Sequence, residues 1–441
     1  SSNKIISFIN IRNYSTISKK KILICGNDIP GLSLALFLKK KGVSSEIVDS
    51  GNNSKNDTGI VLTNNCYNAF KNNGGGTVAD ELLNNSTQLN GIGYFSKYGQ
   101  SYGFLNFLEY FKNIQPSNSI VFSSSESKIK EILTSQCIQS NRGEGSVSFK
   151  KGLKIKKISE NEKQQQQTQQ QEEGDGVFIT FSNSHIKVHY DMVIGSSNCY
   201  ESQDPVREYL SDKLEKSTIQ DSLFGKESSM LRYFSTVINN TAELSPPIIT
   251  TQFQREKKLT SFILPNNKIA LSGSFLKKQL KQNEIDNNNT NFKNYVSGEF
   301  SIFEDLGAHN IVSLQDNQTE LTLSTISDFT FKSYAHNSLC LIGDAADKLP
   351  QDNLFGTVIG IEDASKLVQI ITKDEEYKSI PKQLQEFNKD RVTRMDQHMK
   401  VFMNDKRSIF DYHFLLLLLG KYYLKMVYSG KSQYKRLKNL I

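Results

Sequence analysis

One short segment, residues 20–50 (KKILICGNDIPGLSLALFLKKKGVSSEIVDS), restricts the fold of this chain more than any other. Residues 21–25 form an apolar run that predicts a strand, and Gly26 begins a turn. The leucine-rich stretch that follows predicts a helix, which Gly42 ends. A second predicted strand then closes on Asp49. This strand–turn–helix–strand order, with an acid at its end, is typical of a dinucleotide-binding fold.

The turn departs from the dinucleotide-binding fingerprint Gly-x-Gly-x-x-Gly at one position. Between Gly26 and Gly31 the chain reads GNDIPG, so Asp28 replaces the middle glycine. A side chain there obstructs the close approach of a pyrophosphate, and a carboxylate also repels it. Pro30 removes a backbone N–H near the helix start. The alternative is that Asp28 caps the helix by accepting a hydrogen bond from a first-turn N–H.

Composition excludes several classes of protein. The 441 residues can bury a large core, divided between two packed domains. The net charge of +7 is mild, and no dense basic stripe is interleaved with aromatic residues, so we expect no nucleic-acid partner. Five scattered cysteines favour free thiols over a disulfide framework, and the histidines lack metal-ligand spacing, so we expect no metal site.

Both ends of the chain have a distinctive composition. Residues 1–20 contain basic residues and serines but no acid, which is typical of a mitochondrial transit segment; the alternative is a disordered arm. Residues 403–441 predict a helical tail that becomes basic and acid-free after residue 420. That tail either packs on the core with a solvated basic end or docks on the anionic inner mitochondrial membrane.

A second motif lies near the other end of the chain. Residues 339–342 predict a buried strand that leads into the sequence GDAAD with Asp344, and Pro350, Gly356 and a helix over 360–372 follow. Small residues let a flat cofactor approach the backbone, and Asp344 can accept a hydrogen bond from a sugar hydroxyl. The helix start favours an anionic group. The segment therefore predicts contact with a phosphate-bearing cofactor.

These motifs, in this order and with a β-rich stretch between them, resemble those of the class A FAD-dependent monooxygenases of the p-hydroxybenzoate hydroxylase type. Within that class the chain most resembles the ubiquinone-biosynthesis ring hydroxylases, over residues 21–402. The resemblance implies an α/β fold: an FAD-type Rossmann domain in discontinuous segments, with an inserted mixed or antiparallel β-sheet substrate domain. We expect the FAD-binding-like domain at 21–76, 120–229 and 331–402, and the substrate domain at 77–119 and 230–330.

The same resemblance implies FAD as cofactor and NAD(P)H as electron donor. It places Gly26 and Gly31 beneath the pyrophosphate, and Asp49 on the adenosine ribose. The further cofactor-binding residues that it implies are Asp344, Pro350 and Gly356. It names no catalytic side chain, because the flavin carries the chemistry of hydroxylating an aromatic or quinone-precursor ring. The implied substrate is a small aromatic or a lipid-quinone molecule.

The cofactor motifs are degenerate in this chain. Besides Asp28, residues that differ from the family pattern are Glu126, Ser197, Asn198, Asp347, Leu354 and Val358. If five such changes each cost about 1 kcal/mol, FAD affinity falls by roughly a few thousandfold. We therefore expect weak or lost FAD. Two hypotheses stay open: a mitochondrial FAD-dependent monooxygenase-like oxidoreductase, and a pseudoenzyme of the same fold that acts as a binding or assembly partner.

Overall fold

The computed structural model describes the central part of the chain with several gaps. The described residues are 20–49, 57–96, 98–99, 101–107, 120–160, 176–196, 204–218, 231–239, 247–254, 257–276, 294, 296–298, 300, 321–324, 329–347, 356–373 and 379–410. The transit segment expected at 1–20 lies outside them except for Lys20, as does the tail beyond residue 410. Within the described residues, no helix is both long and apolar enough to cross a bilayer.

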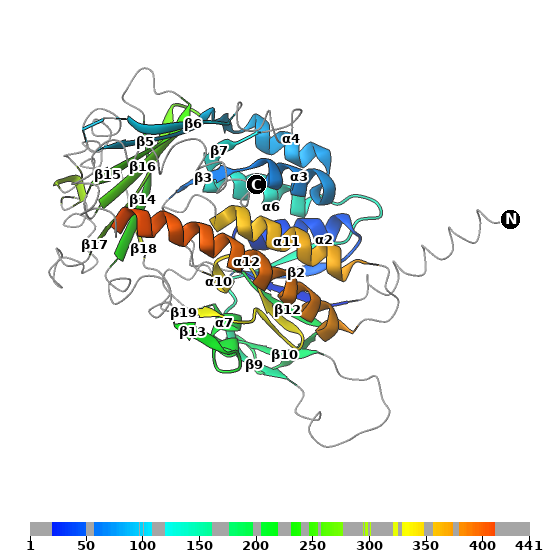
Figure 1. The fold of residues 1–441 in the computed structure, drawn as a ribbon. Coiled ribbons are helices and arrows are strands. Elements are labelled where there is room, and N and C mark those ends of the chain that lie inside the picture. The colour runs from blue at the N-terminus through cyan, green and yellow to red at the C-terminus, as the bar shows by residue number, and fades with distance from the viewer. Residues whose placement is uncertain are drawn as a thin grey trace, which may run out of the picture.

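A six-stranded sheet has the order β20-β21-β12-β1-β2-β8, and its strands β2 and β12 lie in the lower half of Figure 1. All neighbours pair in parallel except β20 and β21. The predicted strands at 21–25 and 339–342 therefore lie in one parallel sheet, separated by β12, as expected. The six strands are β1 (Ile22–Cys25), β2 (Ser45–Asp49), β8 (Val147–Lys151), β12 (Met192–Gly195), β20 (Ala335–His336) and β21 (Leu339–Leu341).

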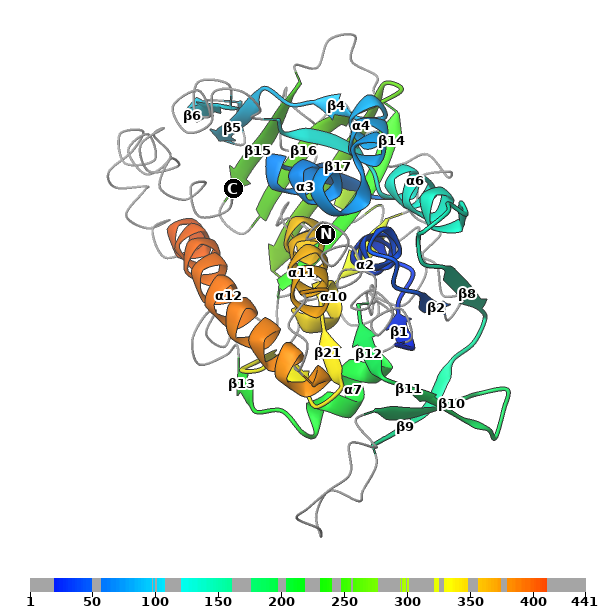
Figure 2. The ribbon, with the colours of Figure 1, turned by 90° about the vertical axis from the view of Figure 1, so that its right-hand side faces the viewer.

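The two faces of this sheet bury different partners, because successive side chains of a strand point to opposite faces. Ile22 and Ile24 of β1 pack in a cluster with helices that cover one face. These helices are α2 (Ile29–Lys40), α3 (Asn64–Ala69), α4 (Gly76–Asn84), α6 (Glu126–Ile138), α11 (Gly356–Ile371) and the first turns of α12 (Ile380–Phe410). Leu23 and Cys25 face the other side. They pack with helix α7 (Pro205–Ser211) and with a three-stranded sheet of β9 (Ile155–Glu160), β10 (Val177–Phe181) and β11 (Lys187–Tyr190). Figure 2 shows α2 and α11 side by side above the strand ends.

Helix α2 forms where the leucine-rich stretch was predicted. It is apolar around most of its circumference, and every residue from Ile29 to Lys39 is buried. A helix that is hydrophobic on all sides must be covered on all sides. Helix α2 satisfies this requirement by contacts with α6, α11 and the sheet.

A second, seven-stranded sheet has the order β18-β14-β17-β16-β15-β5-β6. Its neighbours are antiparallel except β5 and β15, so the sheet is mixed. The strands are β5 (Gly91–Ser96), β6 (Ser101–Asn106), β14 (Leu231–Asn239), β15 (Ile248–Gln254), β16 (Lys257–Leu264), β17 (Lys268–Leu276) and β18 (Thr322–Ser324). Segments from the two predicted parts of the substrate domain thus share one sheet. The exact domain boundaries stay a prediction, and α4, which begins at the predicted boundary, packs in one core cluster with α2 and α6.

Smaller elements complete the fold. A three-stranded sheet, β3-β7-β4, lies between α11 and the seven-stranded sheet, and a two-stranded sheet pairs β13 with β19. The remaining elements are β3 (Gly59–Leu62), the π-helical turn η1 (Phe70–Gly74), β4 (Thr87–Gln88), β7 (Phe122–Ser125), α7 (Pro205–Ser211), β13 (Lys216–Thr218), β19 (Phe329–Phe331), α10 (Gly343–Ala346) and α12 (Ile380–Phe410).

Two sequence expectations were wrong in detail. The alternation of apolar and polar residues over 146–158 predicts one strand that forms a hairpin with 177–181, but the stretch divides. Its first part, β8, joins the parallel sheet beside β2, and only β9 (Ile155–Glu160) pairs with β10 (Val177–Phe181). Residues 187–194 likewise divide into β11 (Lys187–Tyr190), which pairs with β10, and β12, which enters the parallel sheet. Alternation alone cannot show where a strand leaves one sheet for another.

Candidate cofactor site

The turn between β1 and α2 has the shape that its glycines predict. Gly26 adopts φ 137°, a conformation that side chains rarely tolerate, and its N–H donates to the carbonyl of Val48 in β2. A Cβ atom on Gly31 would lie 2.5 Å from the carbonyl oxygen of Gly26 and 2.6 Å from Ser196 Oγ. Any larger residue at position 31 would force the turn apart. Gly26 and Gly31 therefore form a tight cradle at the end of β1.

Asp28 lies at the N-terminus of α2 and caps it. Its Oδ1 atom accepts hydrogen bonds from the Gly31 N–H at 2.9 Å and from Ser196 Oγ at 2.9 Å. The capping alternative for Asp28 is thus confirmed. The carboxylate uses a first-turn N–H that a bound phosphate would otherwise receive.

Burial raises the pKa of Asp28 to about 7, and the nearby carboxylate of Asp344 adds to this rise. The hydrogen bonds from Gly31 and Ser196 and the charge of Lys130 oppose the rise but do not cancel it. Desolvation favours the neutral form of a carboxyl group, as does a neighbouring carboxylate. Asp28 therefore changes its charge near neutral pH.

The two motifs, more than 300 residues apart in the sequence, meet at Pro30. Gly343 adopts φ 54°, and a Cβ on it would lie 2.9 Å from Pro30 Cγ. A Cβ on Gly360 of α11 would approach the same ring even more closely. Pro30, in the first turn of α2, thus packs against the glycines of α10 and α11. Asp344 lies near the glycine turn as well, since its charge acts on Asp28.

Asp49 ends β2, as predicted, and its Oδ2 atom accepts a hydrogen bond from Asn27 Nδ2 at 3.2 Å. The pair joins the glycine turn to the end of the neighbouring strand. Because the carboxyl ends of parallel strands share one edge, this edge carries the turn, Asp49 and the Gly343–Asp344 segment together.

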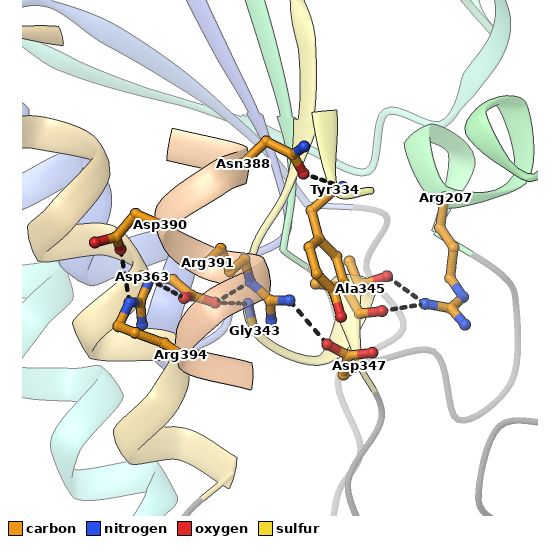
Figure 3. Close-up of polar contacts among 11 residues, drawn as sticks. Arg207, Tyr334, Gly343, Ala345, Asp347, Asp363, Asn388, Asp390, Arg391 and Arg394 are labelled. Atoms are coloured by element: carbon orange, nitrogen blue, oxygen red, sulfur yellow. Dashed lines mark hydrogen bonds and ion pairs between the residues drawn. The ribbon is translucent and has the colours of Figure 1, made fainter. Parts of the chain in front are cut away.

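A buried network of charges holds α10 from the side of α12 (Figure 3). Arg391 is 0% exposed, and its Nε and Nη1 atoms donate to Asp363 Oδ2 and Asp347 Oδ2, each at 2.8 Å. The Tyr334 ring lies 3.9 Å from the Arg391 guanidinium carbon. Arg394 also donates to Asp363, at 3.0 Å. Asp347, which differs from the family pattern, is therefore a structural partner of Arg391.

Burial alone lowers the pKa of Arg391, but the carboxylates of Asp363 and Asp347 raise it above its ordinary value. The arginine stays charged, and its charge is neutralised by two buried acids. Asp363 Oδ2 also accepts from the Gly343 N–H, at 3.3 Å. The network thus connects α11 and α12 directly to the start of α10.

Arg207 holds α10 from the opposite side. Its Nη1 atom donates to the carbonyl oxygens of Ala345 at 2.6 Å and Ala346 at 2.7 Å. Helix α7, which carries Arg207, is capped by Asp204 through the N–H groups of Val206 and Arg207. The carbonyls at the end of a four-residue helix thus receive a buried cationic partner.

Of the remaining residues singled out from the sequence, only some lie within the described part of the chain. Gly356 is the first residue of α11, while Pro350 lies outside the described residues, as do Ser197, Asn198 and Leu354. Val358 is buried in the core cluster with α2. Glu126 begins α6 and accepts a hydrogen bond from Thr58 Oγ1 at 2.6 Å.

Sequence reasoning missed two site residues. Ser196 donates to Asp28, and Arg391 pairs with Asp347. No local pattern marks Ser196, and nothing in the sequence around Arg391 marks Asp347, 44 residues earlier, as its partner. Among the described residues, no three His, Cys, Asp or Glu side chains are grouped as metal ligands.

Two features of this edge suit an FAD molecule. The turn requires glycine at position 31, where a Cβ atom would collide with the carbonyl oxygen of Gly26, and Asp49 can accept from a sugar hydroxyl. A Cβ atom on Gly343 would lie 2.9 Å from Pro30 Cγ, so the start of α10 packs closely on α2 at this edge. The carboxylate of Asp28, at the start of α2, opposes a pyrophosphate here when it is ionised.

Comparison with solved structures agrees with this geometry. HpxO from Klebsiella pneumoniae, in a structure complexed with FAD and uric acid, matches with a TM-score of 0.73 at 16% identity, over 96% of this chain and 97% of that one. This chain has the fold of the FAD-dependent monooxygenases. The p-nitrophenol 4-monooxygenase PnpA from Pseudomonas putida DLL-E4 matches with a TM-score of 0.72 at 12% identity, over 96% and 98%. PqsL from Pseudomonas aeruginosa matches with a TM-score of 0.65 at 14% identity, over 89% and 99%.

The sequence matches no protein-family profile and no curated protein sequence. At identities of 12–16% the likeness establishes the fold: a Rossmann-type domain with a substrate domain. The special closeness to ubiquinone-biosynthesis hydroxylases stays a prediction from the sequence.

Proposed function

We propose that this chain is an FAD-dependent oxidoreductase of the ring-hydroxylating monooxygenase kind, and that it holds FAD weakly. One observation carries the proposal: the β1–α2 turn, the end of β2 and the GDAAD segment converge at the carboxyl edge of one parallel sheet. Pro30 against Gly343 and Asn27 on Asp49 join these three parts. In a doubly wound sheet, cofactors bind at this edge.

The proposed roles follow from position. Gly26 and Gly31 would let the backbone approach the pyrophosphate, Asp49 would accept from the adenosine ribose, and Asp344 would lie near the ribityl chain. Gly356 and Pro350 complete the proposed set. When bound, FAD would supply electron transfer from NAD(P)H and the activation of dioxygen for ring hydroxylation. The protein's part is to bind, orient and exclude water, so no side chain is assigned as acid, base or nucleophile.

Titration of the purified full chain with FAD tests the proposal. We expect a substoichiometric flavin absorbance after purification, restored by added FAD and lost again on dialysis. With FAD present, NAD(P)H oxidation should become measurable. A protein that shows no flavin binding at saturating FAD, at pH 6 as well as pH 8, contradicts an FAD-dependent function. Full occupancy that survives dialysis contradicts weak binding.

A second candidate is a pseudoenzyme of the same fold that serves as a binding or assembly partner. The cap formed by Asp28 favours it, because the carboxylate occupies the positive end of α2 where an anion would be stabilised. The buried network around Arg391 also holds α10 through the protein's own side chains. The two candidates differ in the FAD titration above, since only the first predicts binding and NAD(P)H oxidation.

Mitochondrial import and contact of the tail with the inner membrane belong to the same proposal. They are supported by the acid-free composition of residues 1–20 and of residues 421–441. We expect a chain tagged at its C-terminus to enter mitochondria, and the same chain without residues 1–20 to stay outside. Fluorescence microscopy with a matrix marker checks this. A signal that does not change on deletion of the segment contradicts import through it.

A further inference from the structure

One face of the seven-stranded sheet carries a row of buried hydroxyl groups. Strand register places one residue from each of five adjacent strands in this row, since each is the direct partner of the next. Its members, from β14 to β5, are Ser235, Ser272, Thr260, Thr251 and Tyr94, and we call them the hydroxyl row. All five are buried. A buried row of this kind is unusual for a sheet face, which normally packs apolar side chains.

Two hydroxyls of the row have no hydrogen-bond partner. Ser235 is 5% exposed and Ser272 is 6% exposed, and neither Oγ atom is bonded, although the two residues face each other across β14 and β17. Thr260 and Thr251 bond one another at 3.4 Å. Leaving a hydroxyl buried and unpaired costs free energy, so such groups call for an explanation. A bound ligand that supplies the missing hydrogen-bond partners would explain why these two hydroxyls are kept.

The surroundings of the row suit a flat ring. On the same face, two residues along the strands from the hydroxyl row, the side chains are apolar. Phe262, Ala270 and Ile249 lie there and pack in one cluster with Val61 of β3. In the other direction, Phe253 stacks on Tyr94 with ring centroids 6.1 Å apart and planes 7° from parallel. The row is thus flanked by apolar and aromatic surface on its own face.

The hydroxyl row also lies on the side of the sheet that faces the proposed cofactor domain. Its face contacts β3, and β3 in turn contacts α11, which begins at Gly356. The opposite face of the sheet is covered by Val296 and Phe300. In Figure 1 the β3 strand lies between α11 and the strands of this sheet.

We infer that the hydroxyl row binds the substrate ring, and that this substrate is a small aromatic molecule with several polar substituents rather than a lipid-tailed ring. The inference rests on the proposed function for the existence of a ring substrate. A polyprenyl tail laid over the row would leave the hydroxyls of Ser235 and Ser272 unpaired, whereas ring hydroxyl, carboxyl or amide groups would pair with them. Sites built to hydrogen-bond a substrate discriminate strongly against analogues that lack the polar group.

Binding of defined probes to the full chain tests this inference by calorimetry, with and without FAD. The probes are urate and 3,4-dihydroxybenzoate as polar rings, and decylubiquinone as a tailed ring. We expect at least one polar ring to bind more tightly than decylubiquinone. The double variant Ser235→Ala/Ser272→Ala should weaken that binding by about ten- to a hundredfold, because each hydrogen bond contributes about three- to tenfold.

The control is Ser261→Ala. Ser261 lies next to Thr260 in β16, is 7% exposed, and points to the opposite face, so its loss should leave ring binding within about twofold. Thermal unfolding adds a second readout. If the two serines are kept for a ligand, their removal should leave the ligand-free protein as stable as before or more stable, since it removes unpaired buried groups.

Three results overturn the inference: neither polar ring binds, decylubiquinone binds best, or the serine pair stabilises the free protein without affecting ring binding. The outcome for FAD is separate. FAD binding without binding of a polar ring removes this inference and leaves the proposed function standing. If a polar ring binds, its binding depends on the two serines and the chain never takes up FAD, the hydroxyl row is supported as a ring site and the proposed monooxygenase function is contradicted.

Discussion

Replacing Asp28 with asparagine is expected to raise FAD affinity by about tenfold at pH 8 and to change it little at pH 6. Asparagine keeps a side-chain oxygen that can accept from the Gly31 N–H, so the helix cap is retained while the charge is removed. With a pKa of about 7, the native carboxyl group is roughly 90% ionised at pH 8 and roughly 10% at pH 6. If FAD binds only the chain with a protonated Asp28, the apparent affinity is the intrinsic affinity multiplied by the protonated fraction of Asp28.

The native protein should therefore bind FAD more weakly as the pH rises above 7, by about tenfold per pH unit. Fluorescence titration with FAD at several pH values measures this for both chains. The Asp28→Gly variant should gain at least as much at pH 8, since it also removes the obstructing side chain. Equal affinities of native and asparagine chains at pH 8 would show that the pyrophosphate does not pass this turn.

The same residue affects stability in a predictable direction. The pKa of Asp28 is raised in the folded chain above its ordinary value near 3.8. The unfolded chain then loses the proton first, so the contribution of Asp28 to the free energy of unfolding falls as the pH rises from about 4 to about 7. The asparagine variant lacks this decline, and urea unfolding without FAD checks the difference independently of the cofactor.

Replacing Arg391 with methionine is expected to lower the free energy of unfolding by about 3–5 kcal/mol. The variant leaves Asp347 and Asp363 without the buried cation that bonds both. Breaking a buried ion pair by removing one partner is far more costly than removing the pair together. Methionine fills similar volume, so the effect should come mainly from the two uncompensated acids. Urea unfolding of the full chain, followed by circular dichroism, measures it.

Arg394→Met provides the matched control. Arg394 is 22% exposed and shares Asp363 with Arg391, so Asp363 keeps a partner when Arg394 is lost. Its loss should cost about 1 kcal/mol or less. Adding Asp347→Asn and Asp363→Asn to the Arg391→Met chain should recover much of the stability, because it removes the unpaired charges. An Arg391→Met chain as stable as Arg394→Met would refute the proposed importance of the network.

Local sequence was sufficient for the elements whose signals lie within one turn or one strand. The β1–α2–β2 order followed from an apolar run, a glycine and a leucine-rich helix. The cap at Asp28 was one of two alternatives, because a carboxylate at a helix start bonds its own first turn whatever the rest of the chain does. The second motif was placed correctly in the same sheet, since short apolar strands before glycine turns enter a parallel core.

The sequence by itself determined the class of fold, the turn at Gly26 and Gly31 and the acid at the end of β2, because these depend on neighbours in the chain. Only the tertiary structure decided where β8 and β12 pair, that Asp347 binds Arg391, and that Ser235 and Ser272 face one another unbonded. Strand pairing and buried polar contacts join residues far apart in the sequence. Their energies depend on which groups the folded chain leaves without water, and no local pattern records that.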